Sequence, residues 1–66
     1  MADWLDRAQE EAAQLTARLS GLETFMCLPA FLMLPTEDRN DLKAQRAGMV
    51  IYKVALDNRI ARAVSE

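Results

Sequence analysis

The stretch that decides the fold runs from Asp3 to Cys27 and reads DWLDRAQEEAAQLTARLSGLETFMC. Its apolar residues recur at alternating spacings of three and four, which is the heptad pattern of a helix that packs lengthwise on another helix. The residues of this stripe are Leu5, Ala8, Ala12, Leu15, Leu19, Leu22 and Met26. Charged and amide side chains fill the positions between them and suit a solvent-facing side. The pattern predicts one long helix over about residues 3–27.

A second helix is indicated after Pro35. Thr36 is a favourable N-cap residue, and Glu37 and Asp38 place negative charge where the helix dipole is positive. Only Gly48 interrupts the helix-compatible sequence that follows, so we expect this helix over about residues 37–64. Because the two helices are similar in length, the sequence predicts an antiparallel hairpin.

The connection over residues 28–35 is bracketed by Pro29 and Pro35. Each proline disfavours helical geometry in the residue before it, which leaves room for one short helical turn over residues 30–33. The segment between the prolines is apolar, so we expect the hairpin or a neighbouring molecule to bury it. We expect the thiol of Cys27 to be buried as well.

The composition indicates that the hairpin does not act alone. A chain of 66 residues is shorter than the ~70–80 residues at which one core supplies more than ~3–5 kcal/mol. One Cys and no His leave no internal disulfide and almost no possibility of a structural zinc site. Residues 47–56 are apolar on nearly every side of the second helix, and such a helix is buried on every side. We therefore expect an all-α protein, with a single helical-hairpin domain over residues 1–66 that assembles into a homo-oligomeric bundle.

The second helix combines an apolar stripe with polar residues. Its apolar stripe is expected to face the first helix and consists of Leu42, Met49, Leu56 and Ala63. The complementary heptad position carries Gln45, Tyr52 and Arg59 instead of apolar residues. Residues 1–28 hold two Arg and five acidic residues, a net charge of −3, whereas residues 42–64 hold five Lys or Arg and one Asp, a net charge of +4. This asymmetry fits either dipole matching with ordinary solvated faces, or an anion site lined by the assembled second helices.

Several classes of function are excluded by what the chain lacks. Without His and without a glycine-rich loop, no familiar catalytic pair, metal motif or phosphate loop is available, so we expect no enzyme, no metal and no cofactor. A net charge of −2 without a basic run argues against binding to nucleic acid. The longest apolar run, residues 25–34, is too short for a membrane span of about 20 residues. The acidic N-terminus lacks the features of a secretory signal, so we expect a cytoplasmic protein.

Two features of the sequence resemble known phage proteins. The spacing Leu42-x2-Gln45-x3-Met49-x2-Tyr52-x3-Leu56-x2-Arg59-Ile60, after a heptad helix and a Leu34-Pro35 turn, resembles small helical-hairpin accessory proteins of tailed bacteriophages. Residues 45–55, QRAGMVIYKVA, are similar to the second helix of the phage hairpin proteins that act against CBASS and Thoeris immunity. That resemblance implies an oligomer that sequesters a cyclic nucleotide immune signal between its subunits without catalysis.

The resemblance and the charge of the second helix together give roles to six candidate residues. Arg46, Lys53 and Arg59 would hold phosphates, while Tyr52 and Met49 would contact the base. Gln45 would hydrogen-bond the base.

Other readings stay open. Gln45 can instead set the helix register, and Arg59 can instead complement the helix dipole or form an ion pair between subunits. The alternative function is an oligomeric inhibitor or adaptor that binds a host protein through the acidic face of the first helix or through residues 25–34. A third reading is a structural coiled-coil component of a larger particle. Trp4 is expected to anchor a contact between subunits.

Overall fold

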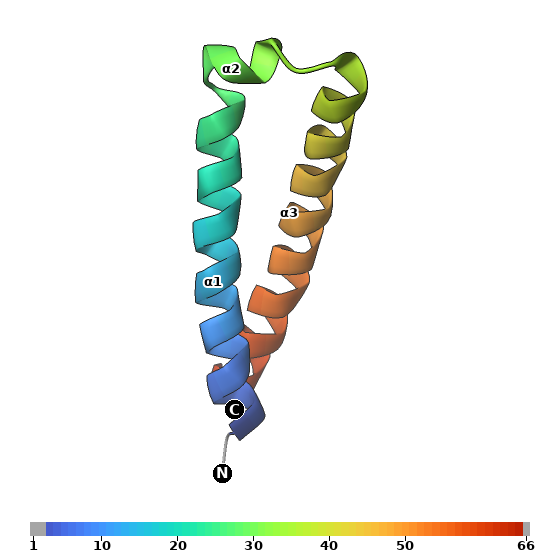
Figure 1. The fold of residues 1–66 in the computed structure, drawn as a ribbon. Helices are drawn as coiled ribbons and strands as arrows, with labels where there is room; N and C mark the ends of the chain where they lie inside the picture. The colour runs from blue at the N-terminus through green and yellow to red at the C-terminus, as the bar shows by residue number, and fades with distance from the viewer. Residues whose placement is uncertain (1–2, 66) are drawn as a thin grey trace.

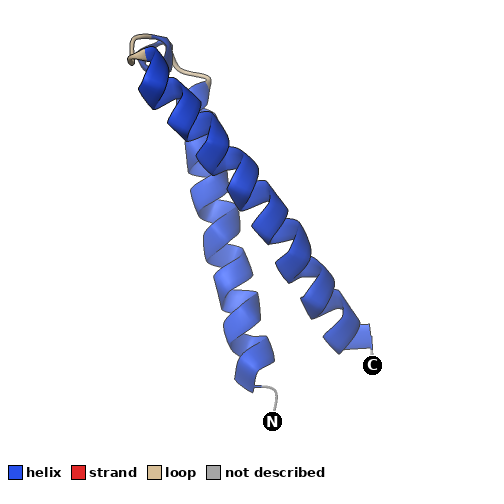
Figure 2. Cartoon of the chain, turned by 90° about the vertical axis from the view of Figure 1, so that its right-hand side faces the viewer, coloured by secondary structure: helices blue, strands red, loops and turns tan. Residues whose placement is uncertain are grey.

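The computed structural model describes residues 3–65, which form a hairpin of two long helices. Helix α1 spans Asp3–Met26, α2 spans Pro29–Leu32 and α3 spans Thr36–Ser65. Figure 1 shows α1 and α3 running antiparallel, with α2 across the closed end. Figure 2 shows that the two long helices are inclined to each other. The prediction of an all-α hairpin is confirmed; the outermost residues of the predicted domain, 1, 2 and 66, lie outside the described part.

The apolar stripe of α1 faces α3, as the heptad pattern predicts. Ala8, Leu15 and Leu19 are buried. The other members of the stripe, Leu5, Ala12, Leu22 and Met26, are half-buried. The prediction for the first helix is therefore confirmed, both in its extent and in the side that packs.

Helix α3 contacts α1 through its apolar stripe, but its second contact row differs from the prediction. Leu56 is only 2% exposed, and the rest of its stripe (Leu42, Met49 and Ala63) is half-buried. The neighbouring row that turns toward α1 contains the half-buried Arg39, Lys53 and Ile60. The row of Gln45, Tyr52 and Arg59 is exposed, so its prediction as the complementary seam is wrong within one chain. The Gln45 row and the Lys53 row lie on either side of the Leu42 stripe, because successive residues are about 100° apart around the helix. Heptad spacing alone does not determine which of the two rows faces α1.

The closed end is only partly buried. Leu28 is extended, as expected of a residue before proline, and Pro29 begins α2. Phe31 is 5% exposed, and its ring packs edge-to-face on Phe25 with centroids 6.2 Å apart. Leu32 and Met33, in contrast, are 68% and 86% exposed. A four-residue helix turns one side inward, so burial by the hairpin is confirmed for Phe31 and is not found for Leu32 and Met33. Their burial by a neighbouring molecule stays a prediction.

Two smaller predictions at this end are also corrected. Cys27 is exposed, because it follows the last residue of α1 and lies outside the packed stripe. The N–H of Arg39 donates to the carbonyl of Pro35 at 3.0 Å, so α3 begins one residue earlier than expected. Thr36 is therefore inside the first turn instead of capping it, and its hydroxyl accepts a hydrogen bond from Arg39 Nη2 at 3.1 Å.

An apolar face of α3 points away from α1. Ile51 is 71% exposed and Val54 is 55% exposed, and both lie in the middle of the helix. Ala47, Gly48 and Ala55 on the same side are exposed as well. None of the described helices combines the length and the apolarity that crossing a membrane requires.

Candidate functional site

The six residues predicted to bind a ligand lie on two different sides of α3. Gln45, Tyr52 and Arg59 follow one another every seven residues along an exposed row. Arg46, Met49 and Lys53 lie on the side that turns toward α1. Neighbours such as Gln45 and Arg46 are about 100° apart around the helix axis. No single side of one chain therefore presents all six.

Arg46 is held by an acidic residue of the other long helix. Its Nη2 lies 2.6 Å from Glu23 Oε2, and its Nε donates to the same oxygen at 2.8 Å. Both side chains are a little less than half exposed, so the pair is accessible to water. Exposed pairs contribute only about 0.2–1 kcal/mol, and an anion that reaches Arg46 has to compete with this one carboxylate.

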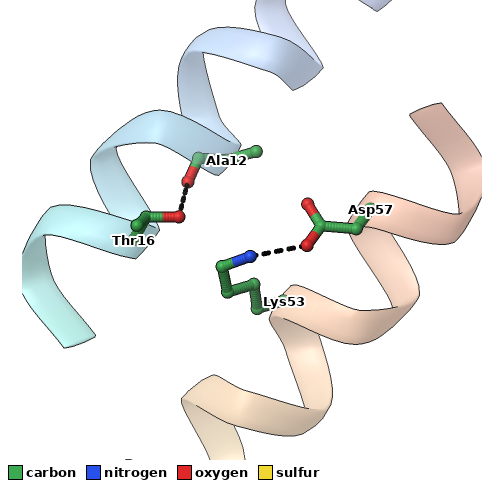
Figure 3. Close-up of polar contacts among 4 residues, drawn as sticks. All are labelled: Ala12, Thr16, Lys53 and Asp57. Carbon is green, nitrogen blue, oxygen red and sulfur yellow. Dashed lines mark hydrogen bonds and ion pairs between the residues drawn. The ribbon is translucent and has the colours of Figure 1, made fainter. Parts of the chain in front are cut away.

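Lys53 lies in the half-buried row of α3 that turns toward α1. Its Nζ donates to Asp57 Oδ2 at 2.6 Å, one turn further along α3. In Figure 3 its side chain extends from α3 toward the α1 segment that carries Ala12 and Thr16. There the Thr16 hydroxyl donates to the Ala12 carbonyl within α1 at 2.9 Å. An ammonium carries three N–H donors, so the Asp57 contact leaves others for a ligand.

Arg59 lies near the open end of the hairpin, over the indole of Trp4. Its guanidinium carbon is 5.6 Å from the ring centroid, which is cation–π distance. Trp4 and Arg59 line a shallow, open hollow together with Arg62 and Ala63. The contact joins the first turn of α1 to the last turns of α3. Trp4 and Arg62 were not among the six predicted residues.

Met49 and its neighbour Gly48 offer a ligand no charged side chain. Met49 is half-buried beside α1, where its flexible side chain fills the interface. A Cβ atom on Gly48 would meet nothing within 4 Å, so nothing in this chain requires glycine there. The described residues also contain no group of three or more His, Cys, Asp or Glu placed to hold a metal ion. The candidate residues therefore provide positive charges at separate places along α3, each beside aromatic or apolar side chains.

Comparison with known protein families gives a match over most of the chain. The family model described as Sequestin matches residues 2–62, which is nearly the whole chain. This match fits the resemblance of the second helix to nucleotide-sequestering phage hairpins. Neither the curated proteins nor the solved structures give a match.

Proposed function

The chain belongs to the Sequestin family, and on that premise we propose that it sequesters an anionic cyclic nucleotide signal without converting it. The family's description supports a protein that binds and withholds a molecule, and no catalytic family is indicated. The ligand lies between subunits of a homo-oligomer. The setting that fits the resemblance is a phage protein that counters host defence in the cytoplasm of the infected cell.

The observation that carries this proposal is the cationic α3. Residues 42–64 have a net charge of +4, although the whole chain has a net charge of −2. Arg46, Lys53 and Arg59 are spread along the helix at steps of roughly 10 Å. Charge-assisted hydrogen bonds to phosphate are the strongest contacts that such side chains make. Tyr52, which is 46% exposed, offers a ring and a hydroxyl beside them.

The division of the six residues supports a ligand that bridges copies. One copy contributes the exposed row of Gln45, Tyr52 and Arg59. Another copy contributes Arg46 and Lys53 from the flank beside its own α1. Several subunits around one small ligand then supply more cations than one chain can bring together, which favours the tight binding that sequestration requires.

The exposed middle of α3 supports assembly with a second copy. The described chain buries only five apolar side chains: Ala8, Leu15, Leu19, Phe31 and Leu56. Ile51 and Val54 remain exposed on the opposite side of α3 from α1. Burying this face against another copy adds the apolar area that a hairpin of this size lacks.

The proposal is tested by light scattering followed by a thermal-shift screen. The screen uses cyclic mono-, di- and trinucleotides and cyclic ADP-ribose isomers. A ligand at about 100 times its dissociation constant stabilises the fold by ~2.7 kcal/mol, a shift of several degrees for a small domain. Arg46→Gln and Lys53→Gln should each weaken the shift, whereas Lys43→Gln, which removes an exposed cation outside the six, should not. A monomer without a hit, or equal shifts in all variants, contradicts the proposal.

A second candidate is an oligomeric inhibitor or adaptor that binds a host protein. The observation that favours it is the exposed apolar surface at the closed end, where Leu28 is 47% exposed beside the still more exposed Leu32 and Met33. If this surface binds a host protein, Leu32→Ser and Met33→Ser should abolish capture of that protein and leave nucleotide shifts unchanged. Substitutions of Glu10 and Glu11 test the acidic face of α1 in the same assay. Capture that survives all four changes contradicts this candidate.

A further inference from the structure

We propose that the open end of the hairpin carries a second nucleotide site, in which Arg59 and Arg62 bind the phosphate and Trp4 contacts the base. The inference takes only its ligand class from the proposed function. It assigns a site that is separate from the mid-helix cations Arg46 and Lys53 and shares Arg59 with the site proposed above, and it gives Trp4 and Arg62 a role in binding.

The antiparallel hairpin brings these three residues together. Trp4 lies in the first turn of α1, and Arg59 and Arg62 lie in the last two turns of α3. Residues three apart share one side of a helix, so both arginines point to the same region. Together with Ala63 they line the hollow at this end. Trp4 is 44% exposed, so part of its ring surface is open to a ligand.

The contact with Trp4 orients Arg59 without using its hydrogen-bond donors. The guanidinium carbon lies 5.6 Å from the ring centroid, and a guanidinium over an aromatic face keeps its N–H groups for other partners. Within residues 3–65, no hydrogen bond or ion pair involves the side chain of Arg59 or of Arg62. Arg46 and Lys53, by contrast, are already paired with carboxylates. Two guanidinium groups with open donors match the oxygens of a phosphate.

The charges of the described residues around the hollow leave it positive. On α1, Asp3 pairs with Arg7 at 3.5 Å and so is partly neutralised. Asp6 lies two residues beyond Trp4, about 200° around the helix, and therefore on the far side from the hollow. The negative end of the α3 dipole works against an anion here, but two arginines outweigh its half charge.

The site is distinct from the mid-helix cations by distance along α3. Arg59 lies about 9 Å from Lys53 and about 20 Å from Arg46 at a helical rise of about 1.5 Å per residue. A single phosphate on Arg59 and Arg62 therefore cannot also contact Arg46 of the same chain. Separate substitutions at the two places can tell which of them binds.

Trp4 makes the site directly observable, because it is the only tryptophan of the chain. We would titrate the purified protein with AMP, UMP, adenosine and inorganic phosphate while following tryptophan fluorescence. AMP or UMP should produce a saturable change at lower concentration than adenosine or inorganic phosphate. Arg59→Gln and Arg62→Gln should each weaken this binding by about tenfold or more, the usual loss for a charged hydrogen-bond partner. Arg18→Gln, an exposed arginine of α1 far from the hollow, is the matched control and should bind as wild type.

The following results of the fluorescence titration would contradict the inference. Absence of a saturable change with both nucleotides would overturn it, as would equal affinity in wild type and both Arg variants. Inorganic phosphate binding as tightly as AMP would overturn the assignment to nucleotides.

Arg46→Gln and Lys53→Gln should leave the fluorescence titration unchanged. If they also leave the thermal shifts with cyclic nucleotides unchanged, the mid-helix proposal fails while the open-end site stands.

Discussion

The exposed middle of α3 gives the sharpest test of assembly, through the substitution Ile51→Ala. Ile51 is 71% exposed in the single chain and lies on the side of α3 opposite the stripe that packs on α1. If the chain acts alone, removing this side chain loses almost no buried area. Alanine is also the better helix former, so the single chain would become slightly more stable.

If a second copy buries Ile51, the same substitution destabilises the assembly. The change removes three carbon groups, and each buried CH₂ contributes about 0.8 kcal/mol. With about 70% of the side chain available for burial, the loss is about 1.7 kcal/mol per copy, or about 3 kcal/mol for a dimer that buries both. A loss of that size raises the dissociation constant of the dimer by roughly 100-fold or more.

The assay is sedimentation velocity over a concentration series, with urea unfolding of the same samples. Val64→Ala is the matched control, because Val64 is 62% exposed but lies in the last turn of α3, away from the apolar middle. Ile51→Ala should dissociate at concentrations at which wild type and Val64→Ala remain assembled. A wild-type protein that sediments as a monomer, or an Ile51→Ala variant with unchanged mass and higher stability, would refute the reasoning.

Three further predictions concern the core, the ion pair across the helices and the thiol. Leu56→Ala removes the most buried side chain and should cost about 2–5 kcal/mol in urea unfolding, whereas Leu32→Ala at an exposed position should cost under about 0.5 kcal/mol; similar losses at both would place the core elsewhere. Glu23→Gln removes the carboxylate that holds Arg46, so stability should fall by no more than about 1 kcal/mol while affinity for the cyclic nucleotide rises; weaker binding in calorimetry would show that Arg46 does not contact the anion. Cys27 is exposed in the chain, so a thiol reagent should modify it in the native protein about as fast as in urea, and strong protection would mean that another copy covers the closed end.

The sequence predicts α1 well because one side of that helix is apolar and the others are not. The alternation from Leu5 to Met26 has a single interpretation, and the structure places this stripe against α3. The prolines likewise delimit α2, since their effect on the backbone is local. Features that depend on a single helix or a single residue could thus be predicted from the sequence.

The packing of α3 could not be predicted in the same way. Its middle is apolar nearly all round, so the pattern does not say which flank of the Leu42 stripe turns toward α1. That choice depends on how the two helices incline to each other, which places Lys53 at the interface and leaves Tyr52 exposed. The exposure of Cys27 similarly depends on what covers the closed end, and one chain does not contain that information.

The candidate site shows the same division. The cations of α3 are visible in the sequence as a charge asymmetry, but their partners Glu23 and Asp57 follow from the geometry. The meeting of Trp4 with Arg59 could have been predicted, because antiparallel helices of similar length bring the start of one beside the end of the other. The hollow itself depends on side-chain packing and could not.

Native mass spectrometry of the protein incubated with a pooled panel of cyclic mono-, di- and trinucleotides tests the central claim most directly. The account predicts an oligomer that carries one species of added ligand mass, and the same ligand released intact when the protein is denatured. A monomer, an oligomer without added mass, or a ligand recovered in cleaved form would contradict sequestration between subunits.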